Sequence, residues 1–93
     1  MQYKEIEGKE VIGKLGRVVG KISEMNVDTN TWKVTHVFLT LDKNIVEDLG
    51  FKKPRIGSLK ASIPIEAIEA ISDRVILRNE SLEDLRKILQ TES

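Results

Sequence analysis

The sequence predicts a mainly β domain: a small barrel of antiparallel strands with two short helical segments. Apolar and polar residues alternate over short runs, which is typical of half-buried strands. Glycines or clusters of Asp, Asn and Thr separate these runs, as expected where a chain turns. The length of 93 residues corresponds to one domain, so we expect residues 1–93 to form a single unit.

Two strand candidates occupy the first third of the chain. Residues 8–13 form a short one and residues 17–28 a longer one. Residues 14–16 between them end in glycine, which accepts a positive φ without a steric penalty, so they predict a turn. A second turn follows at residues 28–31, where Asp, Asn and Thr side chains can bond their own backbone.

The longer strand changes phase in its middle. Val18 and Ile22 share one side of an alternating strand, whereas Met25 and Val27 fall on the opposite phase. One extra residue near Ser23 would produce this slip. The sequence therefore predicts a β-bulge, a feature that bends strands around small barrels.

Residues 32–41 form the clearest strand, and we expect it to be the longest, because it is rich in β-branched and aromatic types. Trp32 and alternate residues after it lie on one face. Val37, Leu39 and Leu41 occupy the other. A strand that is apolar on both faces has to be covered twice, once by the core and once by something else. We expect the second cover, over Val37, Leu39 and Leu41, to be a partner.

Trp32 itself has two interpretations. It lies beside a turn, where it can cap the end of the barrel. Tryptophan is also the residue type most enriched at the energetic centres of interfaces, so it can instead contact a partner.

Residues 42–57 break the strand pattern. Asn44 can cap a short helix within residues 44–50, and Gly50 can end it in a left-handed conformation. Phe51 is then expected over Val46, the hydrophobic contact that accompanies such a stop.

A basic loop follows this helix. Lys52, Lys53 and Arg55 surround Pro54, which pushes its predecessor out of the helical region and keeps the loop extended. One interpretation is a plain solvated loop. The other is a loop that binds phosphate or an acidic protein surface. Under both interpretations, we expect the three cationic side chains to be exposed to solvent.

The last third of the chain closes the barrel. Residues 59–63 and 74–77 are the closing strands, and residues 64–71 have room only for a turn of helix and a short strand. A helix covers residues 81–90, with Ser81 as its cap and acidic residues in its first turn. The helix packs on its own barrel or on a neighbour through an apolar stripe of Leu82, Leu85, Ile88 and Leu89.

Composition excludes several classes of protein. There is no cysteine, hence no disulfide and no thiolate metal site, which fits a reducing compartment. The net charge is zero, which argues against a nucleic-acid binder. No segment approaches the roughly 18 apolar residues of a membrane span, and the first residues do not form a signal peptide. We therefore expect a cytoplasmic protein without direct membrane insertion.

Residues with reactive side chains are few and poorly placed. His36 is the only histidine, so a histidine-based metal site cannot form. Glu66, Glu69 and Asp73 have helical spacing, but Pro64 and the turn-like context favour a solvated surface over acid–base chemistry. The glycines match no phosphate-binding motif. The sequence predicts no catalytic residue, no cofactor-binding residue and no metal ligand.

Several segments resemble one known family. The runs GRVVGKISEMNVD (residues 16–28), VTHVFLTL (34–41) and VILRNESLEDL (75–85) look like a PRC-barrel domain. This is the fold of the cytoplasmic domain of the photosynthetic reaction-centre H subunit. It is also the fold of the C-terminal domain of a bacterial ribosome-maturation factor. The resemblance extends over residues 8–89.

Two further segments narrow the resemblance. DLGFKKPRIGS (residues 48–58) and SIPIEAIEAISDRVIL (62–77) are similar to the stand-alone PRC-barrel proteins of euryarchaea, including the archaeal cell-division protein B group. Two residues depart from the pattern. Trp32 stands where a glycine often closes the turn, which leaves the geometry of that turn open. Ser72 stands where glycine is more frequent, which indicates that this second turn needs no positive φ.

The resemblance implies a six-stranded antiparallel PRC-type barrel over about residues 6–78, a short helix in the 44–50 loop, and a C-terminal helix at 81–90. It implies no enzymatic activity and no cofactor. It implies a homodimer, or a mixed dimer with a paralogue, that contacts division-ring proteins around FtsZ. We therefore expect a cytoplasmic protein that is recruited to the division site.

Two classes of function remain. One is a dimeric, protein-binding adaptor in archaeal cell division. The other is a ribosome-assembly or RNA-linked module that grips a ribosomal protein, as the barrel of the maturation factor does. Zero net charge and a barrel without the maturation factor's companion domain favour the adaptor. The expected partner or dimer contacts are Trp32, Val37, Leu39, Leu41, Phe51, Lys52, Lys53, Arg55, Leu82 and Leu85.

Overall fold

The structure is a computed structural model that describes residues 3–55, 57–79 and 81–91. Its strands are β1 (Glu10–Ile12), β2 (Val18–Asp28), β3 (Lys33–Leu41), β4 (Lys60–Pro64), β5 (Ile68–Ile71), β6 (Val75–Leu77) and β7 (Gln90–Thr91). Its helices are α1 (Tyr3–Ile6), α2 (Lys43–Leu49), the 3-10 turn η1 (Ile65–Ala67) and α3 (Leu82–Ile88). The mainly β fold that the alternating pattern predicts is confirmed.

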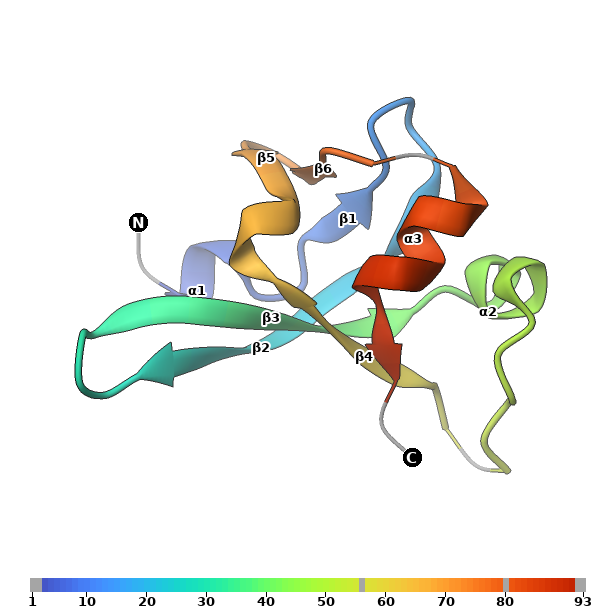
Figure 1. The fold of residues 1–93 in the computed structure, drawn as a ribbon, viewed down its shortest axis with the longest axis horizontal. Helices are drawn as coiled ribbons and strands as arrows, with labels where there is room; N and C mark the ends of the chain where they lie inside the picture. Colours follow the sequence, from blue (N-terminus) through green and yellow to red (C-terminus); the bar gives the residue numbers. More distant parts are fainter. Residues whose placement is uncertain (1–2, 56, 80, 92–93) are drawn as a thin grey trace.

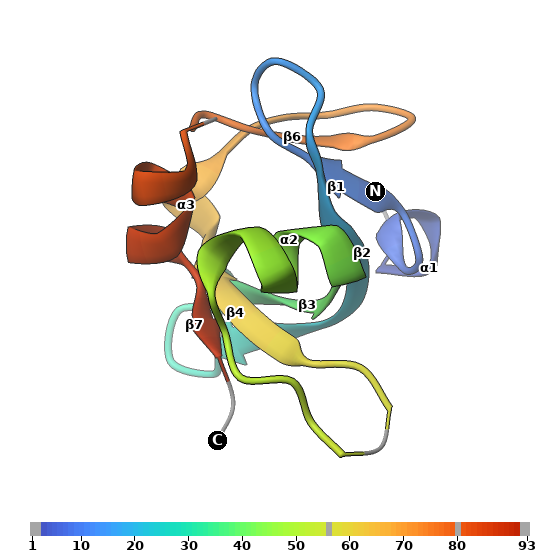
Figure 2. The ribbon, with the colours of Figure 1, turned by 90° about the vertical axis from the view of Figure 1, so that its right-hand side faces the viewer.

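All seven strands belong to one sheet, in the order β5-β6-β1-β2-β3-β4-β7. Neighbouring strands are antiparallel except β1 and β6, which run parallel. The sheet curls around a core, α2 lies across one end of the curl and α3 lies along its side (Figures 1 and 2). The expected six strands become seven because Gln90–Thr91 adds a short strand beside β4.

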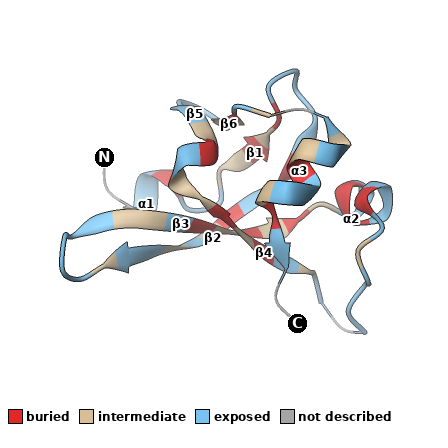
Figure 3. Ribbon diagram, in the orientation of Figure 1, coloured by how far each residue is buried: buried red, intermediate tan, exposed pale blue. Residues whose placement is uncertain are grey.

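The inner face of the curled sheet holds the core (Figure 3). Val37, Leu39 and Leu41 on β3 are at most 4% exposed, and Val11 and Val75 join them from the parallel pair of β1 and β6. The prediction that Val37, Leu39 and Leu41 form an uncovered face of the strand is therefore wrong. They are the core face, and the opposite face of β3 is the one that solvent reaches.

The longest strand is β2, with 11 residues, rather than the segment that starts at Trp32. Trp32 has a φ of 57° and belongs to the turn, so β3 begins only at Lys33. The register of β2 against β3 shifts between Ile22 and Glu24, which confirms the predicted bulge. Ser72, in the turn between β5 and β6, has no positive φ, as its departure from glycine indicates.

β2 and β3 approach each other closely at Gly20. A Cβ atom placed on this glycine would lie 2.3 Å from the carbonyl oxygen of Thr40. Such a distance is too short for any side chain, so the close contact between the two strands depends on glycine here.

A carboxylate and a glycine set the bounds of α2. The Oδ2 atom of Asp42 accepts a hydrogen bond from the backbone N–H of Asn44 at 3.1 Å, so Asp42, and not Asn44, is the N-cap. Gly50 ends the helix with a φ of 72°, as predicted. The N–H of Phe51 then donates to the carbonyl oxygen of Val46 at 3.0 Å, and the chain leaves as the basic loop.

α3 packs on its own sheet. The hydroxyl of Ser81 caps it by accepting a backbone N–H of the first turn at 3.2 Å, as predicted. Leu85 is fully buried and Leu89 is 5% exposed, so the apolar stripe faces the core. The helix ends at Ile88, earlier than predicted, because the chain then turns into β7 and pairs with β4.

Candidate interaction surfaces

β2 and β3 extend beyond the rest of the sheet as a two-stranded arm, residues 24–35 (Figure 1). The register of β1 on β2 runs no further than Lys21, and β4 pairs with β3 only from His36 onward. Within the described ranges, the strands of the arm therefore pair only with each other. Their outer edges present backbone groups with no strand beside them, and such an edge can accept a strand of another chain.

Trp32 lies at the tip of the arm with 78% of its surface exposed. Its N–H donates to the carbonyl oxygen of Asp28 at 2.6 Å, and the N–H of Asn30 donates to Oδ1 of Asp28 at 2.8 Å. Trp32 is the one described residue other than glycine with a positive φ. This left-handed conformation costs an L-residue about 1–2 kcal/mol and is rare for bulky side chains. The turn thus has a geometry that suits glycine, although tryptophan occupies it.

The arm carries further apolar side chains. Val27 is 41% exposed and is the register partner of Val34, which is half-buried. Trp32 and Val27 are therefore two large apolar side chains that are exposed on one projecting hairpin.

The segment between α2 and β4 is basic. Lys52, Lys53 and Arg55 are exposed, as predicted. The Nζ atom of Lys53 lies 2.7 Å from Oε1 of Glu47, and this hydrogen-bonded lysine holds the pKa of Glu47 below its usual value of 4.5. Lys52 and Arg55 form no ion pair with any residue that the structure describes, so their charges remain open to another molecule.

Phe51 anchors this loop to the rest of the molecule. Its half-buried ring packs against the core. The guanidinium carbon of Arg86 on α3 lies 5.9 Å from the centre of the ring, within the range of a cation–π contact. Part of the ring surface that a partner could contact is therefore used within the chain.

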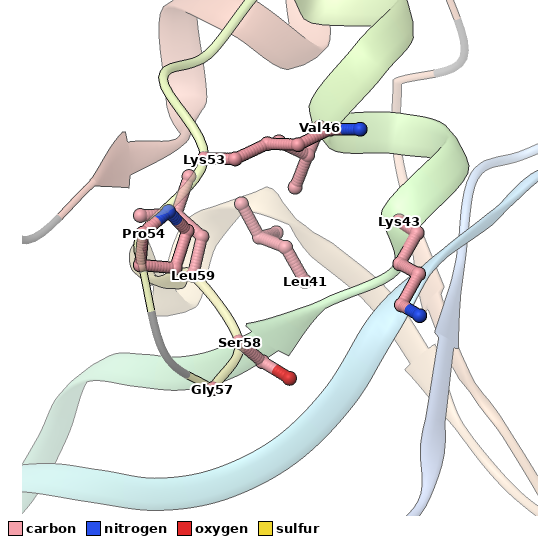
Figure 4. Close-up of a pocket in the computed structure, with 8 residues that line it drawn as sticks. All are labelled: Leu41, Lys43, Val46, Lys53, Pro54, Gly57, Ser58 and Leu59. Atoms are coloured by element: carbon pink, nitrogen blue, oxygen red, sulfur yellow. The ribbon is translucent and has the colours of Figure 1, made fainter.

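A hollow of about 260 Å³ lies between α2 and the loop that follows it (Figure 4). Lys53 extends along one side of the hollow toward α2, and Lys43 stands at the start of α2 on another side. Gly57 and Ser58 complete the rim. The apolar part of the lining consists of Leu41, Val46, Pro54 and Leu59.

The ten contact residues predicted from the sequence separate into three places. Trp32 is at the tip of the arm. Phe51, Lys52, Lys53 and Arg55 follow α2. The other five lie in the core or against it: Val37, Leu39, Leu41, Leu82 and Leu85.

Two exposed residues of these surfaces, Val27 on the arm and Lys43 beside the hollow, were not predicted. Val27 lies on the same face of β2 as Met25, which pairs with the core residue Val37. It is exposed because the arm extends past β1 and β4, and the sequence does not show where those strands end. Lys43 becomes part of a site only because the loop folds back beside α2.

The side chains considered for catalysis or metal binding lie apart from one another. His36 is exposed, and its Nδ1 atom lies 3.2 Å from Oγ1 of Thr35. Glu66 and Glu69 belong to η1 and β5, so they do not share a helix face. No three His, Asp or Glu side chains within residues 3–55, 57–79 and 81–91 are grouped to hold a metal ion. The helices found in these same ranges are too short or too polar to cross a membrane.

Comparison with known proteins identifies a family. The sequence model of the PRC-barrel domain matches residues 1–83, which is most of the chain. No curated protein matches the chain.

Proposed function

Since this chain belongs to the PRC-barrel domain family, we propose that it is a non-catalytic adaptor that binds other proteins through its arm. PRC-barrel domains are generally protein-interaction modules without catalytic activity. One observation carries the proposal for this chain: Trp32 is 78% exposed and is held at a φ of 57°. A tryptophan in this position is unfavourable for the turn and is little buried by the fold, so contact with a partner is the reason to keep it.

The setting of the adaptor is archaeal cell division. The support is the similarity of residues 48–58 and 62–77 to the stand-alone euryarchaeal PRC-barrel proteins of the cell-division protein B group. Under this proposal the partners are proteins of the FtsZ-based division machinery, and the adaptor is a cytoplasmic protein recruited to the division site.

The adaptor acts as a homodimer, or as a mixed dimer with a paralogue. The support is the arm, where residues 24–28 and 33–35 have edges with no neighbouring strand among the described residues. Pairing of two equivalent edges across a two-fold axis covers both at once and is the commonest symmetry of small oligomers. Sedimentation equilibrium at micromolar concentration tests this. A monomer mass there, with a melting temperature that does not change on dilution, contradicts the dimer.

Affinity purification of the tagged protein from its host tests the proposed partners. Three forms are compared: the wild type, Trp32→Gly, and Leu15→Ser as the matched control. Leu15 is 83% exposed in the turn before β2, so the control also removes a large exposed apolar side chain. We expect division-ring proteins to copurify with the wild type and the Leu15 variant and to be lost from the Trp32 variant.

Two results would contradict the proposal. Ribosomal proteins in place of division proteins would favour the ribosome-assembly function instead. Recovery of the same division proteins by all three forms would show that the arm is not the contact surface.

A further inference from the structure

The hollow beside α2 has the size of a side-chain pocket. Its volume of about 260 Å³ is below the roughly 300–1,000 Å³ of typical small-molecule sites. Leu41 and Val46 at its base are each 4% exposed, so the base is made by the core itself and does not depend on a mobile side chain. Pro54 and Leu59 add apolar walls (Figure 4). An aliphatic side chain fits such a lining better than a polar one does.

The surroundings of the hollow are cationic. Residues 50–60 contain four basic residues and no acidic residue. The nearby acidic groups are already engaged: Glu47 with Lys53, Asp48 with Arg17, and Asp42 with the backbone N–H of Asn44. Lys43 and Lys52 are exposed and form no ion pair with the described part of the chain. A ligand that approaches this hollow therefore meets excess positive charge around an apolar centre.

We propose that the hollow binds an acidic peptide segment of a partner protein, which inserts one aliphatic side chain between α2 and the basic loop. Acidic residues on both sides of that side chain would lie near Lys43 and Lys53, with Lys52 and Arg55 close by in the sequence. The cations accelerate association, and the apolar pocket selects the peptide. This inference goes beyond the adaptor function proposed above, because the arm and α2, beside which the hollow lies, are at opposite ends of the molecule (Figure 1).

Fluorescence anisotropy with a labelled synthetic peptide tests the proposal directly. The probe has a single leucine between short runs of Asp and Glu, and a second probe has serine in place of the leucine. We expect the leucine probe to bind about tenfold more tightly than the serine probe, because the side chain leaves water for an apolar pocket. Binding should weaken steeply at about 1 M salt, where the screening length falls to about 3 Å.

Charge-reversed variants locate the binding site. The variant Lys43→Glu with Lys53→Glu changes two exposed rim residues. Lys53 pairs with Glu47, and Lys43 has no ion pair with a described residue. The matched control is Lys14→Glu with Lys87→Glu. Lys14 is likewise exposed and has no ion pair with the residues that the structure describes, and Lys87 pairs with Glu83 at 3.7 Å. Both double variants alter the net charge equally. We expect the rim variant to lose at least tenfold in affinity and the control to stay within threefold.

Three outcomes would overturn the inference. Equal binding of the leucine and serine probes would mean that charge attraction alone holds the peptide. Equal loss in the two double variants would mean that net charge, and not the hollow, governs binding. If the rim variant binds both peptides as tightly as the wild type does but has a lower oligomer mass, a second copy of the chain occupies the hollow. Neither double variant changes the arm or Trp32. A negative result in this experiment therefore leaves the proposed adaptor function intact.

Discussion

At the turn that contains Trp32, we expect glycine to be more stabilising than alanine, which is the opposite of the usual order. At most positions, replacing alanine by glycine destabilises a protein, because glycine loses more backbone freedom on folding. At Trp32 the backbone has a φ of 57°, where a Cβ atom is unfavourable and glycine is not. We therefore expect Trp32→Gly to be more stable than Trp32→Ala.

The size of this difference follows from two opposing effects. The left-handed conformation costs an L-residue about 1–2 kcal/mol, and the extra freedom of unfolded glycine costs about 0.5–1 kcal/mol. The side chain of Trp32 is 78% exposed, and both variants lose nearly the same small burial, so that loss cancels in the comparison. The glycine variant should exceed the alanine variant by about 0.5–1 kcal/mol, which corresponds to roughly 2–8 °C in melting temperature.

Urea denaturation followed by far-ultraviolet circular dichroism measures the difference in the free energy of unfolding. Leu15→Gly and Leu15→Ala, at the tip of another turn, serve as a reference pair, because Leu15 has no positive φ. In that pair the alanine variant should be the more stable one. If alanine is also the more stable residue at Trp32, the turn does not hold the left-handed conformation and the argument for a partner contact loses its basis.

Three further predictions concern the core, the close strand contact and the basic loop. Leu39→Ala empties a fully buried position and should lower the free energy of unfolding by about 2–5 kcal/mol in urea denaturation; a loss below 1 kcal/mol would mean that the site lies outside the core. Gly20→Ala places a Cβ 2.3 Å from the carbonyl oxygen of Thr40 and should cost about 1–3 kcal/mol or more in the same assay, and an unchanged midpoint would contradict the close approach of β2 and β3. Lys53→Met should raise the pKa of Glu47 toward 4.5 in an NMR titration, because the lysine that favours the carboxylate is gone. Because the pKa is lowered in the folded state, this ion pair stabilises the wild type above about pH 4.5, and the stabilisation is lost as pH falls through the pKa of the folded state. Equal titration curves of Glu47 in the variant and the wild type would refute the pairing.

The features that the sequence predicted well are those with local causes. Gly50 ends α2 and Ser81 caps α3 because each acts on a backbone only a few residues away. The bulge near Ser23 is visible as a change of phase within one strand. In each case the physical signal and its effect lie within one turn or one strand, so no knowledge of the fold is needed.

The features that the sequence did not predict depend on distant parts of the chain. β3 has apolar residues on both faces, and the side on which β1, β6 and the helices close over the sheet decides that Leu39 faces the core while Phe38 does not. The hollow exists because Leu59 and Pro54 return beside Val46, which no local pattern records. The candidate surfaces are therefore predicted less well than the fold. Trp32 at the tip of the arm was recognised from the sequence, and the hollow beside α2 was not.

The parallel contact between β1 and β6 determines when the domain can assemble. Val11 and Val75 are neighbours in the sheet although most of the chain lies between them. A growing polypeptide can form the β2–β3 hairpin early, because its strands are adjacent in sequence, whereas the far edge of the sheet must wait for synthesis of β6. Until then β1 has a free edge that another nascent chain can occupy. Pulse-labelled hydrogen exchange during refolding should therefore protect the amides of β2 and β3 before those of β1 and β6, and simultaneous protection would mean that the sheet closes in a single step.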